Sequence, residues 1–516
     1  MGRLLSLNGG ADARLDRCGM KAHEHRAVGD AATGAALVNL GGDTPDERFL
    51  LTHGDVVALS GDFFMPDSAE ADRWRRARGG GVLGTADLFE LAKVPGGQGQ
   101  RVDSRDEIIS ALRVMTLDEE FEDPRVSPGG HLHTPGLGSP KDRSAVETVV
   151  RERFLALAAA NGDHFVSPWG SETPTDPDRH RASRFGSAPQ AYRTLHERAL
   201  DLACRLGATG GDITKALARE AAAQHYLTDS FASGHLRTPV AAIRRFWHQR
   251  YPGFWESLQH EMAGGSVSGL EQILPAVRAV PSGLLRKRAL AAVRASTRRY
   301  PPISLGDLLA RVYHDWDNWQ GLVLDGGETL YGDGRLDRGP GLDLAVAAVK
   351  LGNEDVDVAY HFGVSSRALS GEALFEAVRS ATAAPAGRFR AEANIPVIAA
   401  DNPAQNWKAN DLQSLWIRPI VGDRGATVGE ALSEVVSPGG EVLRRLDCLG
   451  HGLVQIAGIS SLPLWRGLLS GKACEAFHRG VIERLGREPR ASLMAIVRGA
   501  AQFSEETSFD DWLARW

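Results

Sequence analysis

Apolar side chains recur every three or four residues along much of the chain, the spacing that buries one face of a helix. In the segment 144–162 this stripe consists of Val146, Val149, Val150, Phe154, Leu157 and Ala158. In the segment 191–208 it consists of Tyr192, Leu195, Ala199, Leu202 and Leu206. The alanine-rich stretch 213–224 is built from strong helix formers and predicts a further helix. Similar stretches recur between 343 and 516, so the pattern predicts a mostly helical chain.

Composition narrows the class of protein. The chain has 516 residues, a net charge of −6 and a pI near 6.3, so it lacks the basic footprint of a general nucleic-acid binder. Its four cysteines are far apart, which argues against a disulfide framework and a cysteine zinc site. No apolar stretch is long enough to span a membrane, and no secretory signal is seen at the N-terminus. We therefore expect a protein that stays in the cytoplasm or leaves by a non-classical route.

The sequence HYLTDSFASGH carries the strongest candidate chemistry. His225 and Asp229 are four residues apart, so on a helix they share a face and can point at one ion. Gly234 is a candidate helix end, because glycine readily adopts the left-handed conformation there, and His235 follows at once. A single His-x3-Asp pair is usually a surface hydrogen bond. The second histidine makes metal binding an equal alternative, since imidazole and carboxylate are common zinc donors.

His-x3-Asp-x5-His at the close of a helix resembles the ligand motif of the bacterial zinc-dependent phospholipases C, whose structural relatives are the P1-type nucleases. The resemblance covers about the first two-thirds of the chain through scattered short matches. It implies an all-α, multi-helix core with inserted loops that holds three zinc ions in a cleft. It also implies that His225 and Asp229 share one zinc, that Asp229 touches a second, and that His235 belongs to a neighbouring zinc. We expect a catalytic domain over 1–340, with an insertion at about 240–305, and an additional helical region over 341–516.

The resemblance suggests further ligands before the central motif. DHF followed by Pro168 resembles a family element whose histidine joins the same zinc, which assigns His164. Near the start of the chain, His25, or else His23, is the candidate for an early zinc ligand; we expect this His-x-His pair in an extended segment. Asp55 is the first choice for an aspartate that binds zinc and orients the attacking water. Asp62 is the second choice, although Gly-Asp pairs also mark ordinary turns.

The remaining zinc ligands depart from the family pattern of His-x3-Glu. His248 and His260 lack a suitably spaced glutamate, so we assign His314 and Asp317, with Asp315 as a rival. Asp333 could support the same set of ligands. The alternative is that this stretch is an acidic turn held in place by aromatic side chains. The pair His131 and His133 lies in a loop rich in Gly and Pro that we interpret as a linker.

Two further assignments complete the candidate site. His196 lies beside a buried stripe and is expected behind the metal ligands, as are Asp62 and Asp315. Asp163 is expected to cap a helix or to support the ligands.

The function implied is phosphodiester hydrolysis by water activated on two or three Zn²⁺ ions. The leading substrate is a phosphatidylcholine-type phospholipid, reached by transient membrane-surface contact and cut to diacylglycerol and a phosphorylated headgroup. No G-x-S-x-G, P-loop or HExxH pattern supports other hydrolase classes. The alternatives are a P1-like nuclease or nucleotidase, and a helical interaction or effector protein with a structural zinc.

Overall fold

The computed structural model describes part of the chain: residues 22–69, 71–72, 86–97, 101–121, 146, 149–150, 153, 157, 161–166, 186–238, 240, 252–257, 259–260, 282–297, 314, 317–318, 321–332, 335–365, 371–384 and 387–399. Of these, 66% are helical and 8% lie in strands, which confirms the expected helical class. The α-helices of the described residues include α1 (Ala22–Thr33), α2 (His53–Leu59), α4 (Leu88–Lys93), α5 (Arg105–Phe121), α7 (Ala188–Thr209), α8 (Thr214–Asp229), α9 (Ser233–Arg237), α12 (Ser282–Thr297), α14 (Gly341–Ser365) and α15 (Gly371–Thr382). Short 3₁₀ turns are η3 (Asn161–His164), η5 (Leu336–Arg338) and η7 (Glu392–Asn394).

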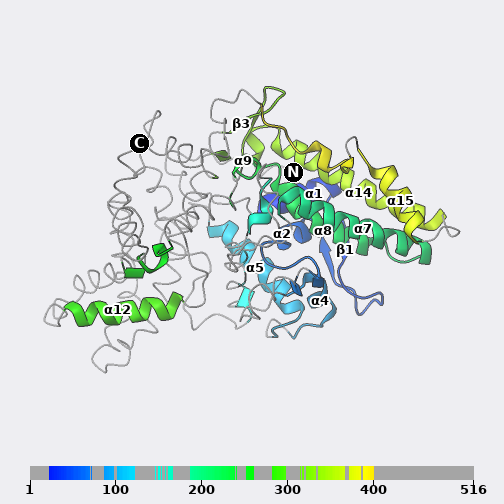
Figure 1. Ribbon diagram of the computed structural model, residues 1–516. Coiled ribbons are helices and arrows are strands. Elements are labelled where there is room, and N and C mark those ends of the chain that lie inside the picture. The colour runs from blue at the N-terminus through cyan, green and yellow to red at the C-terminus, as the bar shows by residue number, and fades with distance from the viewer. Residues whose placement is uncertain are drawn as a thin grey trace.

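Helix α8 lies at the centre of the main helical body, with α1, α2, α7 and α14 packed against it (Figure 1). Every residue from Glu220 to Asp229 is buried. Alanines on one side of α8 pack with Val56 and Leu59 of α2, whereas Tyr226 and Leu227 on another side join side chains of α7 and α14. Because many side chains of α8 are small, neighbouring helices approach it closely and contact its polar residues from several directions.

Helices α7 and α14 touch backbone to backbone. A Cβ on Gly207 would lie 2.0 Å from the Tyr360 carbonyl oxygen, and one on Gly363 would lie 2.1 Å from that of Cys204. Only glycine permits this approach. Because α14 is locked onto α7 in this way, residues 341–365 pack into the same body as the predicted catalytic domain. The boundary expected at residue 340 does not separate α14 from that body, and residues 400–516 lie outside the described part of the chain.

A short hairpin and helix α2 pack against α8. Strands β1 (Leu37–Asn39) and β2 (Leu50–Thr52) pair antiparallel. Thr52 then caps α2 in a reciprocal capping box with Asp55. After α2 the chain turns tightly through Gly61, whose φ is +81°. A Cβ there would lie 2.3 Å from the His225 ring, so glycine is required for the turn to approach α8.

Two local predictions at the motif are wrong. The His-x-His pair at 23 and 25 lies in α1 rather than in an extended segment, and His25 alone of the two is fully buried. The central helix ends at Asp229, not at Gly234, which lies inside the separate helix α9. Gly234 is needed for close packing instead, because a Cβ there would lie 2.4 Å from the His314 carbonyl oxygen.

A second hairpin and helix α15 follow later in the chain. Strands β3 (Leu322–Val323) and β4 (Thr329–Leu330) pair antiparallel in a tight hairpin. Helix α15 packs on α7 and α14. Among the described residues, no helix is long and apolar enough to cross a membrane.

Candidate metal centre

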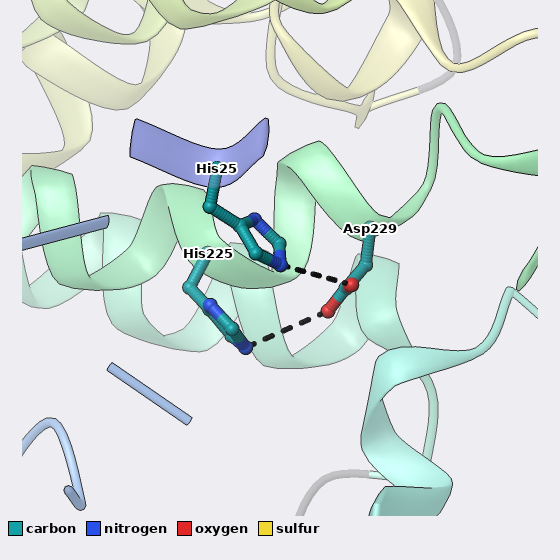
Figure 2. Close-up of side chains that lie close together, drawn as sticks. All are labelled: His25, His225 and Asp229. Carbon is teal, nitrogen blue, oxygen red and sulfur yellow. Dashed lines mark ion pairs between the residues drawn. The ribbon is translucent and has the colours of Figure 1, made fainter. Parts of the chain in front are cut away.

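Five segments bring histidines and carboxylates to the C-terminal end of α8. They are α1, the turn after α2, η3, α8 itself and α9, which supply His25, Asp62, His164, His225, Asp229 and His235. All but Asp62 are buried, and Asp62 is half-buried. Figure 2 shows His25 and His225 on the same side of Asp229, each directing a nitrogen at its carboxylate.

Asp229 lies between two pairs of imidazoles, one for each carboxylate oxygen. Its Oδ1 lies 3.4 Å from His25 Nε2 and 3.4 Å from His235 Nδ1. Its Oδ2 lies 2.9 Å from His164 Nδ1 and 3.7 Å from His225 Nε2. The two oxygens therefore face different neighbours, which is the arrangement of a carboxylate that bridges two positive centres.

The second nitrogen of three of these rings is held by the protein. His225 Nδ1 donates to the Val57 carbonyl oxygen at 3.0 Å, and His235 Nδ1 donates to that of His164 at 2.8 Å. The Thr228 hydroxyl lies 2.8 Å from the Gln224 carbonyl oxygen and donates to it, so it must accept from His25 Nδ1, 2.7 Å away. These bonds leave Nε2 of His25 and of His225 as the atom available to an ion.

The groups of the cluster shift one another's pKa values. Burial would raise the pKa of Asp229, but the four surrounding histidines hold that pKa well below its ordinary value. Burial, reinforced by His25, lowers the pKa of His225 well below its ordinary value, so this ring is neutral and can use its lone pair. Burial raises the pKa of Asp62, against the opposing effect of His164 and His25.

The donor set fits a metal ion. Two groups of described residues have ligand atoms within 4.8 Å of one another: His25, His225 and Asp229, and Asp62, His164 and His225. Three buried atoms of the cluster, His25 Nε2, His164 Nε2 and Asp229 Oδ2, have no hydrogen-bond partner among the described residues. Buried polar atoms are almost always hydrogen-bonded, so three unpaired atoms this close together mark the cluster as a candidate binding site. These groups could hold a metal ion.

Asp62, rather than the first choice Asp55, joins the cluster. The Asp55 carboxylate accepts from the Thr52 backbone in the capping box and pairs with Arg26 Nη2 at 2.6 Å. That carboxylate stabilises the start of α2 and belongs to neither ligand group. The structure therefore places Asp62, and not Asp55, among the candidate ligands, because the tight turn at Gly61 brings Asp62 close to His164.

The third ligand set is only partly as predicted. The rings of His314 and His235 are 4.8 Å apart, so His314 does reach the cluster. Asp317 does not, because Arg237 binds its carboxylate with two hydrogen bonds, one of them 2.7 Å long from Nε. Asn318 lies beside His314 instead, with its amide nitrogen 3.2 Å from His314 Nε2. The side-chain oxygen of Asn318 accepts from the backbone of Gly234.

His196 does not support the metal ligands directly. It lies in a separate buried network, where its Nδ1 is 2.6 Å from Glu220 and its Nε2 is 3.7 Å from Asp355. The prediction that places it behind the ligands is therefore wrong. Asp163 accepts from the Gly186 backbone at 3.0 Å, as a supporting residue should.

Sequence reasoning missed Thr228, although a signal for it exists. Glu220, Gln224 and Thr228 follow one another at intervals of four, a polar row on a helix that is otherwise rich in alanine. His23 is half-buried and His260 is exposed, and neither is in a ligand group. Asp315, Asp333, His131, His133 and His248 lie outside the described residues.

Comparison with known proteins finds no relative whose site can be compared with this one. No family model, no curated protein and no solved structure matches the chain.

Proposed function

We propose that the chain is a zinc-dependent phosphodiester hydrolase, most specifically a phospholipase C acting on phosphatidylcholine-type lipids. The observation that carries the proposal is Asp229, whose two oxygens face separate histidine pairs in a buried site. A structural zinc needs four ligands around one point. A bridging carboxylate with a surplus of donors is typical of sites that hold two ions.

The residues divide into two ligand sets in this proposal. His164, His225, Asp62 and Asp229 Oδ2 would hold one ion. His25 and Asp229 Oδ1 would hold the second, with His235 and His314 beside them. The mixture of imidazole and carboxylate donors suits zinc. When bound, zinc ions would supply a water of lowered pKa and neutralise charge on the phosphate oxygens.

The protein's own groups would orient the reaction. Asp62 is the one carboxylate of the cluster that is half-buried, so it can contact a water that enters from solvent and accept its proton. Thr228, the Val57 carbonyl oxygen and the His164 carbonyl oxygen fix the orientation of three rings. Burial of the remaining ligands excludes other water from the cluster.

The test compares Asp62→Asn with Asp55→Asn, since both remove one negative charge near the start of the chain. We measure zinc per chain by elemental analysis and release of diacylglycerol and phosphocholine from phosphatidylcholine. Asp62→Asn should lose about one ion and at least 100-fold in activity, on the scale of removing a group that acts on the attacking water.

Asp55→Asn is the matched control and should keep its zinc and its activity, with a loss of about 1 kcal/mol in the free energy of unfolding for the weakened cap. Equal loss of zinc in both variants would refute the placement of Asp62 at the site. Cleavage of nucleic acid but not of lipid would transfer the proposal to the nuclease alternative.

A further inference from the structure

Helix α12 has a charge unlike that of the rest of the chain. Its 16 residues include four basic side chains and no acidic one, in a chain whose net charge is −6. The basic residues are Arg286, Lys287, Arg288 and Arg294. The remainder of the protein therefore carries a net charge of −10, so charge is unevenly distributed between α12 and the rest of the molecule.

One side of α12 is exposed over its length. Leu284, Lys287, Ala291 and Arg294 follow at intervals of three and four residues, which places them in one row on the helix. All four are exposed, and so is Arg286 beside them. Leu284, at one end of this row, is 47% exposed, which is unusual for a large apolar side chain. The row combines positive charge with an accessible leucine.

This helix lies away from the cluster. Figure 1 shows α12 well apart from α8 and the helices packed around it. It also falls within the segment of about 240–305 that the resemblance to the zinc-dependent phospholipases predicts as an insertion, and none of the candidate metal ligands at Asp229 comes from α12.

We propose that the exposed row of α12 docks the protein on an anionic phospholipid surface. This inference rests on the proposed function, because it supplies the step by which the enzyme reaches a lipid substrate. Cationic side chains at an anionic leaflet each strengthen binding by about fivefold, or about 1 kcal/mol. The acidic remainder is repelled by the same surface, so the charge asymmetry turns α12 toward it.

Leu284 favours a membrane over a nucleic acid as the partner. Basic helices that lie in the membrane interface bury apolar side chains at the acyl boundary while their cations meet the headgroups. A phosphate backbone would attract the same cations but would give the leucine no apolar environment. A lipid surface satisfies both features of the row.

The experiment measures binding of the full chain to vesicles of phosphatidylcholine with and without phosphatidylserine, by co-sedimentation. The test variant combines Arg286→Gln, Lys287→Gln and Arg294→Gln. The control combines Arg48→Gln, Lys93→Gln and Arg205→Gln, which remove the same charge from side chains that are 49%, 54% and 66% exposed elsewhere. Single variants Leu284→Ser and Asp229→Asn complete the set.

The unchanged protein should bind vesicles that contain phosphatidylserine far more tightly than vesicles of phosphatidylcholine alone. The α12 variant should lose on the order of 100-fold in vesicle affinity, whereas the control should change by about twofold, since charges beyond a Debye length are screened. Leu284→Ser should lose about tenfold. Asp229→Asn should bind vesicles normally while lacking activity, so docking and catalysis can fail separately.

Three results would overturn the proposal. The first is equal loss in the α12 variant and the control, which would make net charge the cause. The second is vesicle binding that none of the α12 substitutions changes. The third is salt-dependent binding of a DNA or RNA duplex through the same three cations, unaffected by Leu284→Ser and without vesicle binding, which would assign the row to nucleic acid.

Discussion

The middle of α8 and its C-terminal end hold the same kinds of residue in opposite arrangements. In the middle, Glu220 meets His196, whose second nitrogen faces Asp355, and Arg390 binds Asp355 in turn. At the end, Asp229 faces four imidazoles, two of which also lie near Asp62. Glu220, His196, Asp355, Asp229 and these imidazoles are all buried, so solvent cannot account for the difference between the two sites.

Charge balance separates a structural network from a binding site. In the His196 network two cations meet two carboxylates, and Glu220 also accepts from Tyr192 and Gln224, at 3.2 Å and 3.0 Å. Positive and negative groups therefore balance in this network, although His196 Nε2 and Asp355 Oδ2 have no hydrogen-bond partner among the described residues. At Asp229, four imidazole nitrogens face two carboxylate oxygens, so the nitrogens and oxygens are not matched one to one. We propose that a cation completes this site, and the predictions below test that distinction.

The largest effect is expected from Asp229→Asn. Removing the one carboxylate that faces both histidine pairs should release the bound metal and lower activity by about 10³-fold or more, since metal ions supply several kcal/mol of transition-state stabilisation. Elemental analysis and steady-state assays measure both quantities. A variant that keeps its full metal content and activity would place the centre elsewhere.

Glu220→Gln should give the converse result. Removing the charge of one partner in a buried ion pair leaves the other uncompensated and should cost about 3 kcal/mol in the free energy of unfolding, with metal content unchanged. Urea unfolding measures the loss. Glu197→Gln is the control, because its surface pair with Arg379, 3.5 Å apart, should contribute less than about 1 kcal/mol. Loss of metal from Glu220→Gln would show that the two sites are not separate.

The His196 network should also make stability depend on pH. Burial alone would lower the pKa of His196, but Glu220 and Asp355 raise it to about 9. The folded pKa exceeds the unfolded one, so this stabilisation is complete below about pH 6.5 and is lost as pH rises through about 9, at about 1.4 kcal/mol per pH unit.

Unfolding measured across that window in the unchanged protein and in Glu220→Gln isolates this contribution, because the metal centre is common to both. The unchanged protein should lose stability more steeply with rising pH than the variant does. Parallel curves would mean that His196 is neutral in the folded protein.

The smallest effect is expected from Thr228→Val. The substitution removes the hydroxyl that accepts from His25 Nδ1 and should weaken metal binding by about 10- to 100-fold without changing the fold. Competition with a chelator measures the affinity. Thr228→Ser keeps the hydroxyl and should restore most of the affinity; equal loss in both variants would mean that packing, not the hydrogen bond, is responsible.

The sequence predicted the helices and the central pair of site residues better than it predicted which side chains contact each candidate ligand. His225 and Asp229 were found because a spacing of four on one helix is a local property. His25 and His164 depended on a resemblance, and the structure brings both to Asp229. Asp55 and Asp62 could not be ranked from sequence, since only the fold reveals that Thr52 and Arg26 occupy the first.

The same limit explains Asp317 and His196. Each has a carboxylate or imidazole of the right type near the right place in the chain. Their roles are decided by distant residues, Arg237 for Asp317 and Glu220 for His196, and no local pattern reports such partners. The end of α8 at Asp229 was missed because Gly234 resembles a helix terminator, whereas its task is close packing against residue 314.

The most direct test of the account is the number of zinc ions bound per chain. The full chain, purified without chelator and supplied with zinc, is measured by elemental analysis before and after chelation, together with cleavage of phosphatidylcholine. The account predicts at least two ions per chain, lost together with cleavage and restored together by zinc. One ion or none, or cleavage that persists after chelation, would contradict a metal centre bridged by Asp229.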